Sequence, residues 1–229
     1  MKTKDFAASV SVLGSASPKE FATPSKLKRS TLSCLAGFIL SIVSAPAAAQ
    51  EVVRVTIETN FSPNRDGVRP IQDAWIRELG KADRSVRVAM YSFTLQSFKN
   101  ALIEAQGRGV DVRVLGDSSA LLRGAAPSCL AVDLYNAGIS IKAYVPLDSR
   151  DILHDKFMLI DDSVLITGSA NFTTSAVQFN HENSIIIKAL ENGSRFIASY
   201  QSQFESMWND EFGDFNGFFV DWVPEGACQ

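Results

Sequence analysis

The segment His154–Asn171 contains the residues of this chain that are best suited to chemistry. His154, Lys156 and Asp161 follow the pattern His-x-Lys-x4-Asp, and Gly168-Ser169-x-Asn171 comes shortly after them. An imidazole can act as a nucleophile or as a proton carrier near neutral pH. An ammonium group beside it can neutralise an oxygen of a phosphate. The spacing therefore predicts a site that attacks phosphodiesters through a histidine.

A strand is predicted over Leu153–Ile160, and it would bring the two basic groups together. Side chains alternate along a strand with a period of two, so His154 and Lys156 would project from the same face. Ser169 and Asn171 have the same spacing and would offer a hydroxyl and an amide to the remaining phosphate oxygens. The alternative is an ordinary buried hairpin in which His154 is a satisfied core histidine.

Around this segment the sequence alternates between strand-like and helical periodicity. The expected strands are Val52–Ile57, Val86–Ser92, Val110–Leu115, Ile139–Tyr144, Leu153–Ile160, Val164–Thr167 and Glu182–Lys188. The expected helices are Arg69–Leu79, Leu95–Gln106, Leu130–Asn136, one that begins within Asn171–Val177, and Ser194–Trp208. A loop of small residues is expected at Ser118–Ser128. This alternation predicts the α/β class, with a mixed β-sheet flanked by helices on both faces.

Residues 1–49 have the features of an export signal. A basic stretch at residues 26–29 precedes the apolar run Leu32–Val43, and an Ala-x-Ala pattern predicts cleavage after Ala49. The apolar run is short for a membrane span, although an uncleaved N-terminal anchor is the alternative. The mature protein would then be periplasmic or secreted.

Cleavage would leave 180 residues, enough for one domain with a sizeable core. We expect a phosphodiesterase domain at residues 50–209 and an aromatic, acidic tail at residues 210–229. The whole chain has 22 basic and 25 acidic residues, and the export segment carries six and two of them, so the mature net charge is 16 − 23 = −7. An acidic chain is unfavourable for a nucleic-acid enzyme, although a local basic groove can still exist on it.

Two cysteines, Cys129 and Cys228, remain after cleavage, and an exported protein would permit a disulfide between them. The sequence contains no cluster of histidines and cysteines with the spacing of metal ligands. We therefore expect no metal and no other cofactor.

The compound motif resembles the signature of the phospholipase D superfamily. Val88–Thr94, Gly109–Val114 and Asn180–Asn183 resemble further segments of its small single-motif branch, the secreted or periplasmic bacterial nucleases. The likeness extends from about Val52 to Trp208.

The resemblance implies a role for each motif residue. His154 would form a phosphohistidine intermediate, and Lys156, Ser169 and Asn171 would bind the phosphate. Glu182 would accept a hydrogen bond from the other ring nitrogen of His154 and fix its tautomer. Asp161 belongs to the catalytic motif, but its role would be more structural than chemical, through bonds to nearby backbone or to a basic side chain.

The motif occurs once in this chain, whereas superfamily members usually carry two copies. Displacement at phosphorus in two steps needs a nucleophile and a separate general acid, which the two histidines of such members divide. His181 is the only other histidine here, and no lysine follows it two residues later. We therefore predict a homodimer with a composite active site on a two-fold axis, to which each subunit gives its His154.

Three functions fit these observations. An endonuclease acting on DNA or RNA is favoured by the short chain and the likeness to the nuclease branch. A phospholipase D acting on phospholipid head groups, such as phosphatidylcholine, gains from the acidic charge and the aromatic tail. A non-catalytic phosphate-binding module is disfavoured, because every motif position has a chemically competent side chain. Phe93 and Phe172 could stack on bases, but packing in the core is the favoured interpretation.

Overall fold

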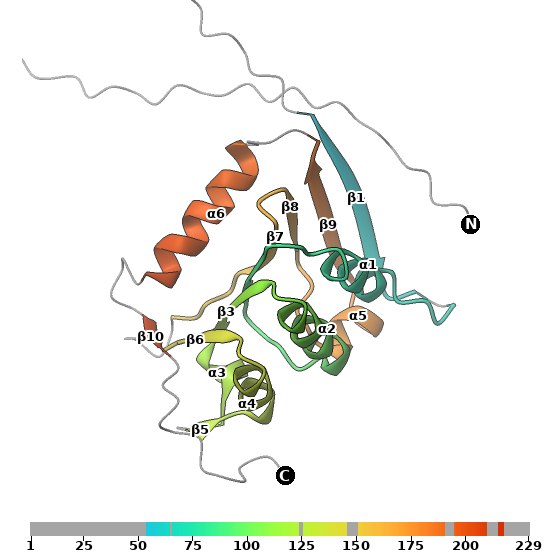
Figure 1. Ribbon diagram of the computed structural model, residues 1–229. Helices are drawn as coiled ribbons and strands as arrows, with labels where there is room; N and C mark the ends of the chain where they lie inside the picture. Colours follow the sequence, from blue (N-terminus) through green and yellow to red (C-terminus); the bar gives the residue numbers. More distant parts are fainter. Residues whose placement is uncertain are drawn as a thin grey trace, which may run out of the picture. The chain divides into compact units, whose positions relative to one another are not determined.

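A mixed eight-stranded sheet forms the centre of the domain. The computed structural model describes residues 54–64, 66–123, 126–145, 151–190, 195–209 and 215–217. The strands of the sheet are β1 (Val55–Ser62), β2 (Ser85–Met90), β3 (Asp111–Asp117), β6 (Ser140–Tyr144), β7 (Lys156–Ile160), β8 (Val164–Gly168), β9 (Glu182–Ala189) and β10 (Phe215–Gly217). Their order is β1-β9-β8-β7-β2-β3-β6-β10 (Figure 1).

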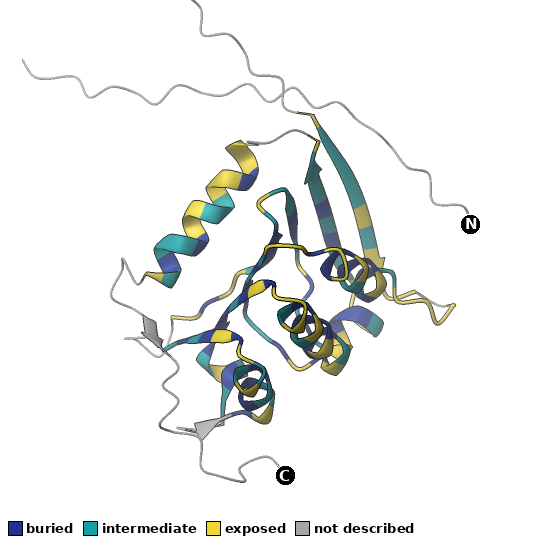
Figure 2. Ribbon diagram, in the orientation of Figure 1, coloured by how far each residue is buried: buried dark blue, intermediate teal, exposed yellow. Residues whose placement is uncertain are grey.

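Helices cover both faces of this sheet, which confirms the predicted fold class. The helices of the first face are α1 (Pro70–Leu79), α2 (Gln96–Gly107), α4 (Cys129–Asn136) and α5 (Thr174–Gln178). Helix α6 (Arg195–Trp208) lies on the other face (Figure 1). Alternate residues of β2 serve the two layers, because Val88 and Met90 pack under α1 and α2 while Ala89 belongs to the cluster that contains Phe204 of α6. Buried residues follow the sheet-facing sides of these helices (Figure 2).

The pairing of the strands collects several strand ends at one edge of the sheet. β2, β3 and β6 are parallel neighbours, whereas β7 pairs antiparallel with both β2 and β8, and β8 pairs antiparallel with β9. Met90 at the end of β2 lies opposite Lys156 at the start of β7. Gly168 at the end of β8 lies opposite Ser184 near the start of β9. We call this edge, formed by the ends of β2, β3 and β8 and the starts of β7 and β9, the site edge.

Two local expectations are wrong. β7 begins at Lys156 and not at Leu153, so His154 precedes the strand. The expected loop Ser118–Ser128 contains a short helix, α3 (Ser118–Leu121), and a small two-stranded ladder of β4 (Leu122–Arg123) and β5 (Ala126–Pro127). Helix α3 forms because the side chain of Asp117 caps its first turn.

Several expectations fall on parts of the chain outside the described residues. These are the export segment 1–49, most of the tail 210–229 and Cys228. Three tail residues are described, and they form β10, which pairs antiparallel with β6. Cys129 takes part in a disulfide, and its pairing with Cys228 stays a prediction. Over the described ranges, no helix is long and apolar enough to cross a membrane.

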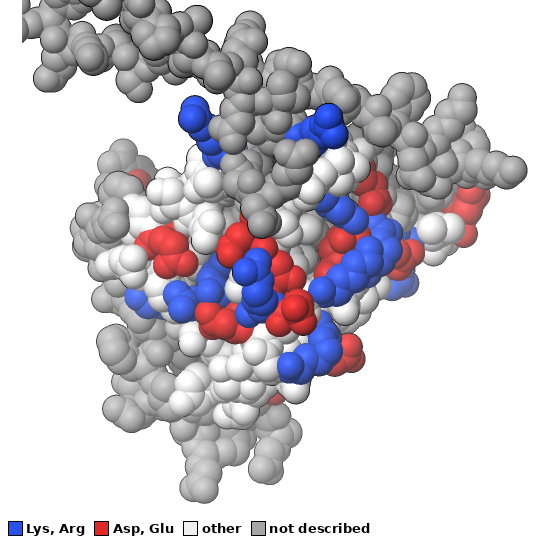
Figure 3. Space-filling model, turned by 45° about the horizontal axis from the view of Figure 1, so that its top comes forward, with Lys and Arg blue, Asp and Glu red and all other residues white. Residues whose placement is uncertain are grey.

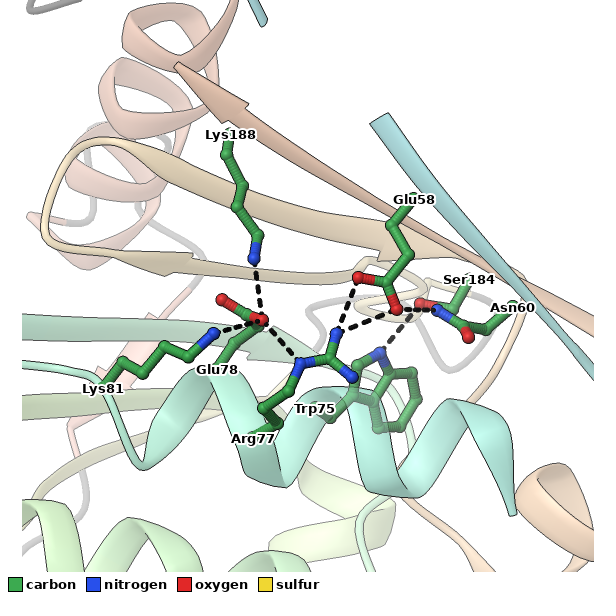
Figure 4. A network of polar contacts seen from close by, with 8 residues as sticks. All are labelled: Glu58, Asn60, Trp75, Arg77, Glu78, Lys81, Ser184 and Lys188. Atoms are coloured by element: carbon green, nitrogen blue, oxygen red, sulfur yellow. Dashed lines mark hydrogen bonds and ion pairs between the residues drawn. The ribbon is translucent and has the colours of Figure 1, made fainter. Parts of the chain in front are cut away.

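A buried carboxylate ties α1 to β1 and β9 (Figure 4). Glu78 is 3% exposed, and its Oε1 atom is 3.0 Å from Arg77 Nε, 3.2 Å from Lys81 Nζ and 2.8 Å from Lys188 Nζ. Arg77 continues the network to Glu58 on β1 at 2.6 Å. Burial opposes the ionised form of Glu78, but the bonds from the three cations outweigh it and lower the pKa of the carboxyl.

Replacing this carboxylate should destabilise the domain in a pH-dependent way. A lowered carboxyl pKa stabilises the fold above the ordinary pKa, and that stabilisation is lost as the pH falls through the folded pKa. We predict that Glu78→Gln lowers the free energy of unfolding by about 1–3 kcal/mol at neutral pH. Urea denaturation should show this difference shrinking on acidification below the ordinary carboxyl range.

Glu58→Gln is the matched control, because it removes the half-exposed acid of the same network. Its effect should stay below about 1 kcal/mol at neutral pH. Equal losses from the two substitutions, or a Glu78→Gln loss that does not change with pH, would contradict this assignment.

Candidate active site

His154 lies at the site edge, in the segment that leads into β7. Its side chain is exposed. The carbonyl of Asp155 accepts a hydrogen bond from the backbone N–H of Tyr91 at 2.9 Å. This bond keeps the segment beside the end of β2, although it lies outside the strand ladder. His154 is therefore presented by an irregular backbone that is held in place.

Tyr91 is the residue that brings the two basic groups together. Its ring centroid lies 4.9 Å from that of the His154 imidazole, with 57° between the planes. The Lys156 ammonium lies 5.2 Å from the same ring centroid and donates to the carbonyl oxygen of His154 at 2.9 Å. A cation over an aromatic face is attracted by the ring quadrupole. Tyr91 was assigned no role from the sequence, although its place near the end of the predicted strand Val86–Ser92 was a usable signal.

The surroundings of Lys156 make its charged form less favourable than that of an ordinary lysine. Partial burial of the ammonium lowers the pKa of Lys156, and the charges of Glu182 and Asp155 act in the opposite sense. Desolvation raises the pKa of the Asp155 carboxyl, against the effect of Lys156 and His154. The site thus places a cation and carboxylates close together.

Ser169 and Glu182 form a bonded pair at this edge. The Ser169 hydroxyl donates a short hydrogen bond to Glu182 Oε2 and accepts from the backbone N–H of Asn183 at 3.1 Å. Asn180 Nδ2 donates to Glu182 Oε1 at 3.3 Å. A hydroxyl has only one proton to donate, so Ser169 must change partners before it can donate to a phosphate. Its role in phosphate binding stays a prediction.

Gly168 permits this pair to form. Its φ is 150°, and a Cβ atom at this position would lie 2.3 Å from the carbonyl oxygen of Asn183. That carbonyl accepts the backbone N–H of Ser169 at 3.1 Å. The glycine of the motif therefore lets the end of β8 approach the start of β9 closely enough to bring Ser169 to Glu182.

The described residues show no hydrogen bond between His154 and Glu182, so the expected bond stays a prediction. Both carboxylate oxygens of Glu182 accept from other side chains. The imidazole packs against Tyr91, which directly follows β2, and Glu182 begins β9, two strands beyond β7. Glu182 acts on the site through its charge near Lys156.

The other two motif residues lie in different surroundings. The Oδ1 atom of Asn171 is buried and has no hydrogen-bond partner. An anion could accept only from the NH2 group of this amide, because the oxygen cannot donate. Asp161 lies at the far end of β7, where its carboxylate accepts the backbone N–H groups of Asp83, Arg84 and Ser85 at 2.7–2.9 Å. These are backbone bonds of the kind that we expected, and they place Asp161 away from His154.

The segments that follow β2 and β8 bond to each other and pack next to the site edge. The carbonyl of Phe172 accepts from the N–H groups of Thr94 and Leu95 at 2.8 Å. The rings of Phe93 and Phe172 are 1% exposed, and they pack 5.4 Å apart in an edge-to-face arrangement. Their assignment to the core is confirmed, and they do not offer a surface on which bases could stack.

Within the described ranges, no group of three or more His, Cys, Asp or Glu side chains could hold a metal ion. The groups that the site edge offers are an exposed imidazole beside an ammonium group, with carboxylate, hydroxyl and amide groups nearby.

Comparison with known proteins assigns the family. A family model described as "Cardiolipin synthase, PLD-like domain" matches residues 75–208, more than half of the chain. The chain belongs to the phospholipase D superfamily. A phospholipase D of Rickettsia prowazekii is 32% identical over 154 residues, which are 67% of this chain and 70% of that protein. The mitochondrial cardiolipin hydrolase of Xenopus tropicalis is 31% identical over 130 residues, so this chain spans only 57% of that relative's length.

Solved structures of the superfamily have the same fold. The phospholipase D family member Nuc from Salmonella typhimurium matches with a TM-score of 0.59 at 25% identity, over 72% of this chain and 99% of Nuc. NucT from Helicobacter pylori matches with a TM-score of 0.58 at 20% identity, over 71% of this chain and 99% of NucT. The superfamily fold thus accounts for the sheet and for the helices around it.

The electrostatics of the site edge predict how Lys156 titrates. Its pKa should lie below the ordinary lysine value, because burial disfavours the charged form. Carbon-13 NMR of protein labelled at lysine Cε should reveal this, with Lys156→Gln identifying the resonance. Glu182→Gln should lower the Lys156 pKa further, since it removes a neighbouring negative charge. An ordinary pKa, or a rise in Glu182→Gln, would show that our view of the site is wrong.

Proposed function

We propose that the protein is a metal-independent phosphodiester hydrolase that forms a phosphohistidine on His154. The observation that carries this proposal is the exposed imidazole of His154 with the Lys156 ammonium beside it, both placed against the Tyr91 ring. An imidazole nitrogen can attack phosphorus directly, and the ammonium can stabilise the negative charge that grows on the phosphoryl oxygens.

The reaction would run in two displacements. In the first, His154 attacks phosphorus and the bond to one ester oxygen breaks, while a general acid gives that oxygen a proton. In the second, water attacks phosphorus and the bond between phosphorus and His154 breaks, while the same acid, now a base, takes a proton from the water. Lys156 and the NH2 group of Asn171 would contact the phosphoryl oxygens in both steps.

The general acid is proposed to be His154 of a second subunit. One motif per chain supplies one histidine of this kind, and a two-fold axis at the site edge would bring two of them to one phosphate. One imidazole must be neutral and the other charged, so their titrations would belong to the pair. A bound phosphate would lie between two Lys156 side chains and should strengthen the dimer.

Nucleic acid is the substrate that we propose first. The chain matches 99% of Nuc within a single small domain, and its sequence resembles the nuclease branch of the superfamily. Acidic and basic side chains are interspersed over the described part of the face in Figure 3. Ion pairs such as Arg87 with Asp111 and Arg77 with Glu58 offset basic charge on the described part of the chain. Attraction of a polyanion should therefore come from the site edge, and the salt dependence of binding should be shallow.

A phospholipid is the second candidate, and one observation favours it. Phe61 is 62% exposed and Phe179 is 68% exposed, and both border the segment that carries Glu182. Ser62 joins the two regions, because its hydroxyl bonds to the carbonyl oxygens of Ala176 and Asn180. Exposed aromatic rings beside a phosphodiester site suit a lipid interface. The curated relatives named above are a phospholipase D and a cardiolipin hydrolase.

Purified mature protein decides between the two substrates. It is incubated with plasmid DNA, with RNA, and with vesicles of phosphatidylcholine or cardiolipin, each in the presence of EDTA. We expect cleavage of nucleic acid that survives the chelator. Cleavage of vesicles alone would favour the second candidate, and a strict requirement for a divalent cation would contradict the mechanism.

Substitutions in the motif should distinguish the contributions of its residues to catalysis. His154→Ala should lower kcat by about 10³-fold or more, because it removes the proposed nucleophile. Lys156→Ala should cost about 10²-fold through the loss of charge stabilisation. His181→Ala is the matched control, since it removes the other histidine, and it should keep the wild-type rate. A His154→Ala protein with near-normal activity would exclude the assignment.

Mixed dimers test the composite site. We expect activity to fall as the square of the wild-type fraction when wild-type and His154→Ala subunits are allowed to exchange, because each mixed dimer keeps only one of two histidines. The readout is the rate at constant total protein. A linear decrease, or full activity from a protein that light scattering shows to be monomeric, would refute the shared site.

Export to the periplasm or beyond the cell is proposed as well. It is supported by the composition of residues 1–49. N-terminal sequencing of the protein from its native compartment should begin at Gln50, whereas an intact N-terminus would favour the anchored alternative.

A further inference from the structure

A buried carboxylate bonds to the backbone one residue before His154. Asp117 is the last residue of β3 and is 3% exposed. Its Oδ2 atom accepts a hydrogen bond from the backbone N–H of Leu153 at 3.0 Å. Leu153 is the residue before His154, so this bond acts on the backbone that carries the imidazole.

The other oxygen of Asp117 is held by helix α3. Oδ1 accepts the backbone N–H of Ser119 at 2.9 Å and the Ser119 hydroxyl at 2.6 Å. Gly116 makes this tight arrangement possible, because a Cβ atom at that position would lie 2.7 Å from the Leu121 side chain. The carboxylate is therefore oriented by the end of β3 and the start of α3 before it meets Leu153.

Leu153 and Asp155 fix the backbone on the two sides of His154. The Leu153 side chain is 5% exposed and packs in the core cluster that includes Leu115 and Phe157. On the other side, the carbonyl of Asp155 is bonded to the backbone N–H of Tyr91. His154 is the single residue between these two anchors, which explains how an imidazole outside any helix or strand has a defined position.

We propose that Asp117 is a positioning residue for His154, acting through the Leu153 amide. This inference rests on the proposed role of His154 as the nucleophile. Reacting atoms must meet within about 3–3.5 Å and in line, and a misplacement of about 1 Å can cost about 10²-fold in rate. A carboxylate suits the task, because it accepts from Leu153 and Ser119 at once. An asparagine has one acceptor oxygen, and its NH2 group would face an N–H donor.

Asp117→Asn tests the proposal through steady-state kinetics. We expect kcat to fall by about 10- to 100-fold while KM changes by less than about two-fold, because the phosphate-binding groups stay in place. Asp117→Glu keeps a carboxylate on a longer arm and should recover part of kcat. Ser119→Ala keeps the bond to Leu153 and should have a near wild-type kcat. Glu78→Gln, which removes a buried carboxylate far from the site, controls for loss of stability.

Hydrogen exchange of the Leu153 amide supplies a readout that needs no activity. The amide should be protected in the wild-type protein and should exchange at least about ten times faster in Asp117→Asn. If the protein cleaves no phosphodiester, the proposed function fails, while this exchange and the line shape of the His154 ring signals still test the anchor. If Asp117→Asn does not fold, Asp117→Glu takes its place in both measurements.

Three results would overturn the proposal. They are an unprotected Leu153 amide in the wild-type protein, a kcat for Asp117→Asn within about two-fold of wild type, and an equal fall in kcat for Glu78→Gln at a matched loss of stability.

Discussion

The antiparallel pairing of β7 with both β2 and β8 is the interaction on which the site depends. It turns the chain so that two strands end and one begins at the same edge of the sheet, with Met90 opposite Lys156 and Phe157 opposite Thr167. A slip of one residue in this register would turn Lys156 to the other face of the sheet. The register is strongly specified, because β7 is buried on both faces between the two layers of helices.

Within that frame, His154 is placed by contacts that come from distant parts of the sequence. Tyr91 supplies a ring for the imidazole and the ammonium, and Asp117 and the Tyr91 backbone hold the chain on either side. Tyr91 directly follows β2 and Asp117 ends β3, two neighbouring parallel strands of the sheet. The position of His154 thus depends on residues at the ends of strands that do not carry the motif.

The local pattern of the sequence explains what could be predicted. Runs such as Val88–Met90 and Phe157–Ile160 are apolar, since both faces of their strands are covered, and this identified the strands and the α/β class. The spacing of His154 and Lys156 was also enough to identify the chemical groups of the site. Their placement side by side was inferred from strand periodicity, and both groups do lie against the Tyr91 ring, although β7 itself begins only at Lys156.

The remaining differences arise from contacts between residues far apart in the chain. The partner of Glu182 is Ser169, and this could not be read from spacing, because it depends on how closely Gly168 lets β8 approach β9. Tyr91 and Asp117 were overlooked for the same reason, since each lies at the end of an ordinary strand and gains its role only from contacts with the segment Leu153–Asp155. The balance of charge at the site edge likewise depends on this packing, which brings Glu182 near Lys156.

The central claim is that His154 becomes covalently phosphorylated, and trapping that intermediate tests it most directly. The protein is incubated with a short phosphodiester substrate and stopped by denaturation in base, where phosphohistidine persists, and its peptides are analysed by mass spectrometry. We predict a phosphoryl-linked adduct on the peptide that contains His154, lost on brief acid treatment and absent from His154→Ala. Steady turnover with no adduct at His154, or with an adduct on another residue, would contradict this mechanism.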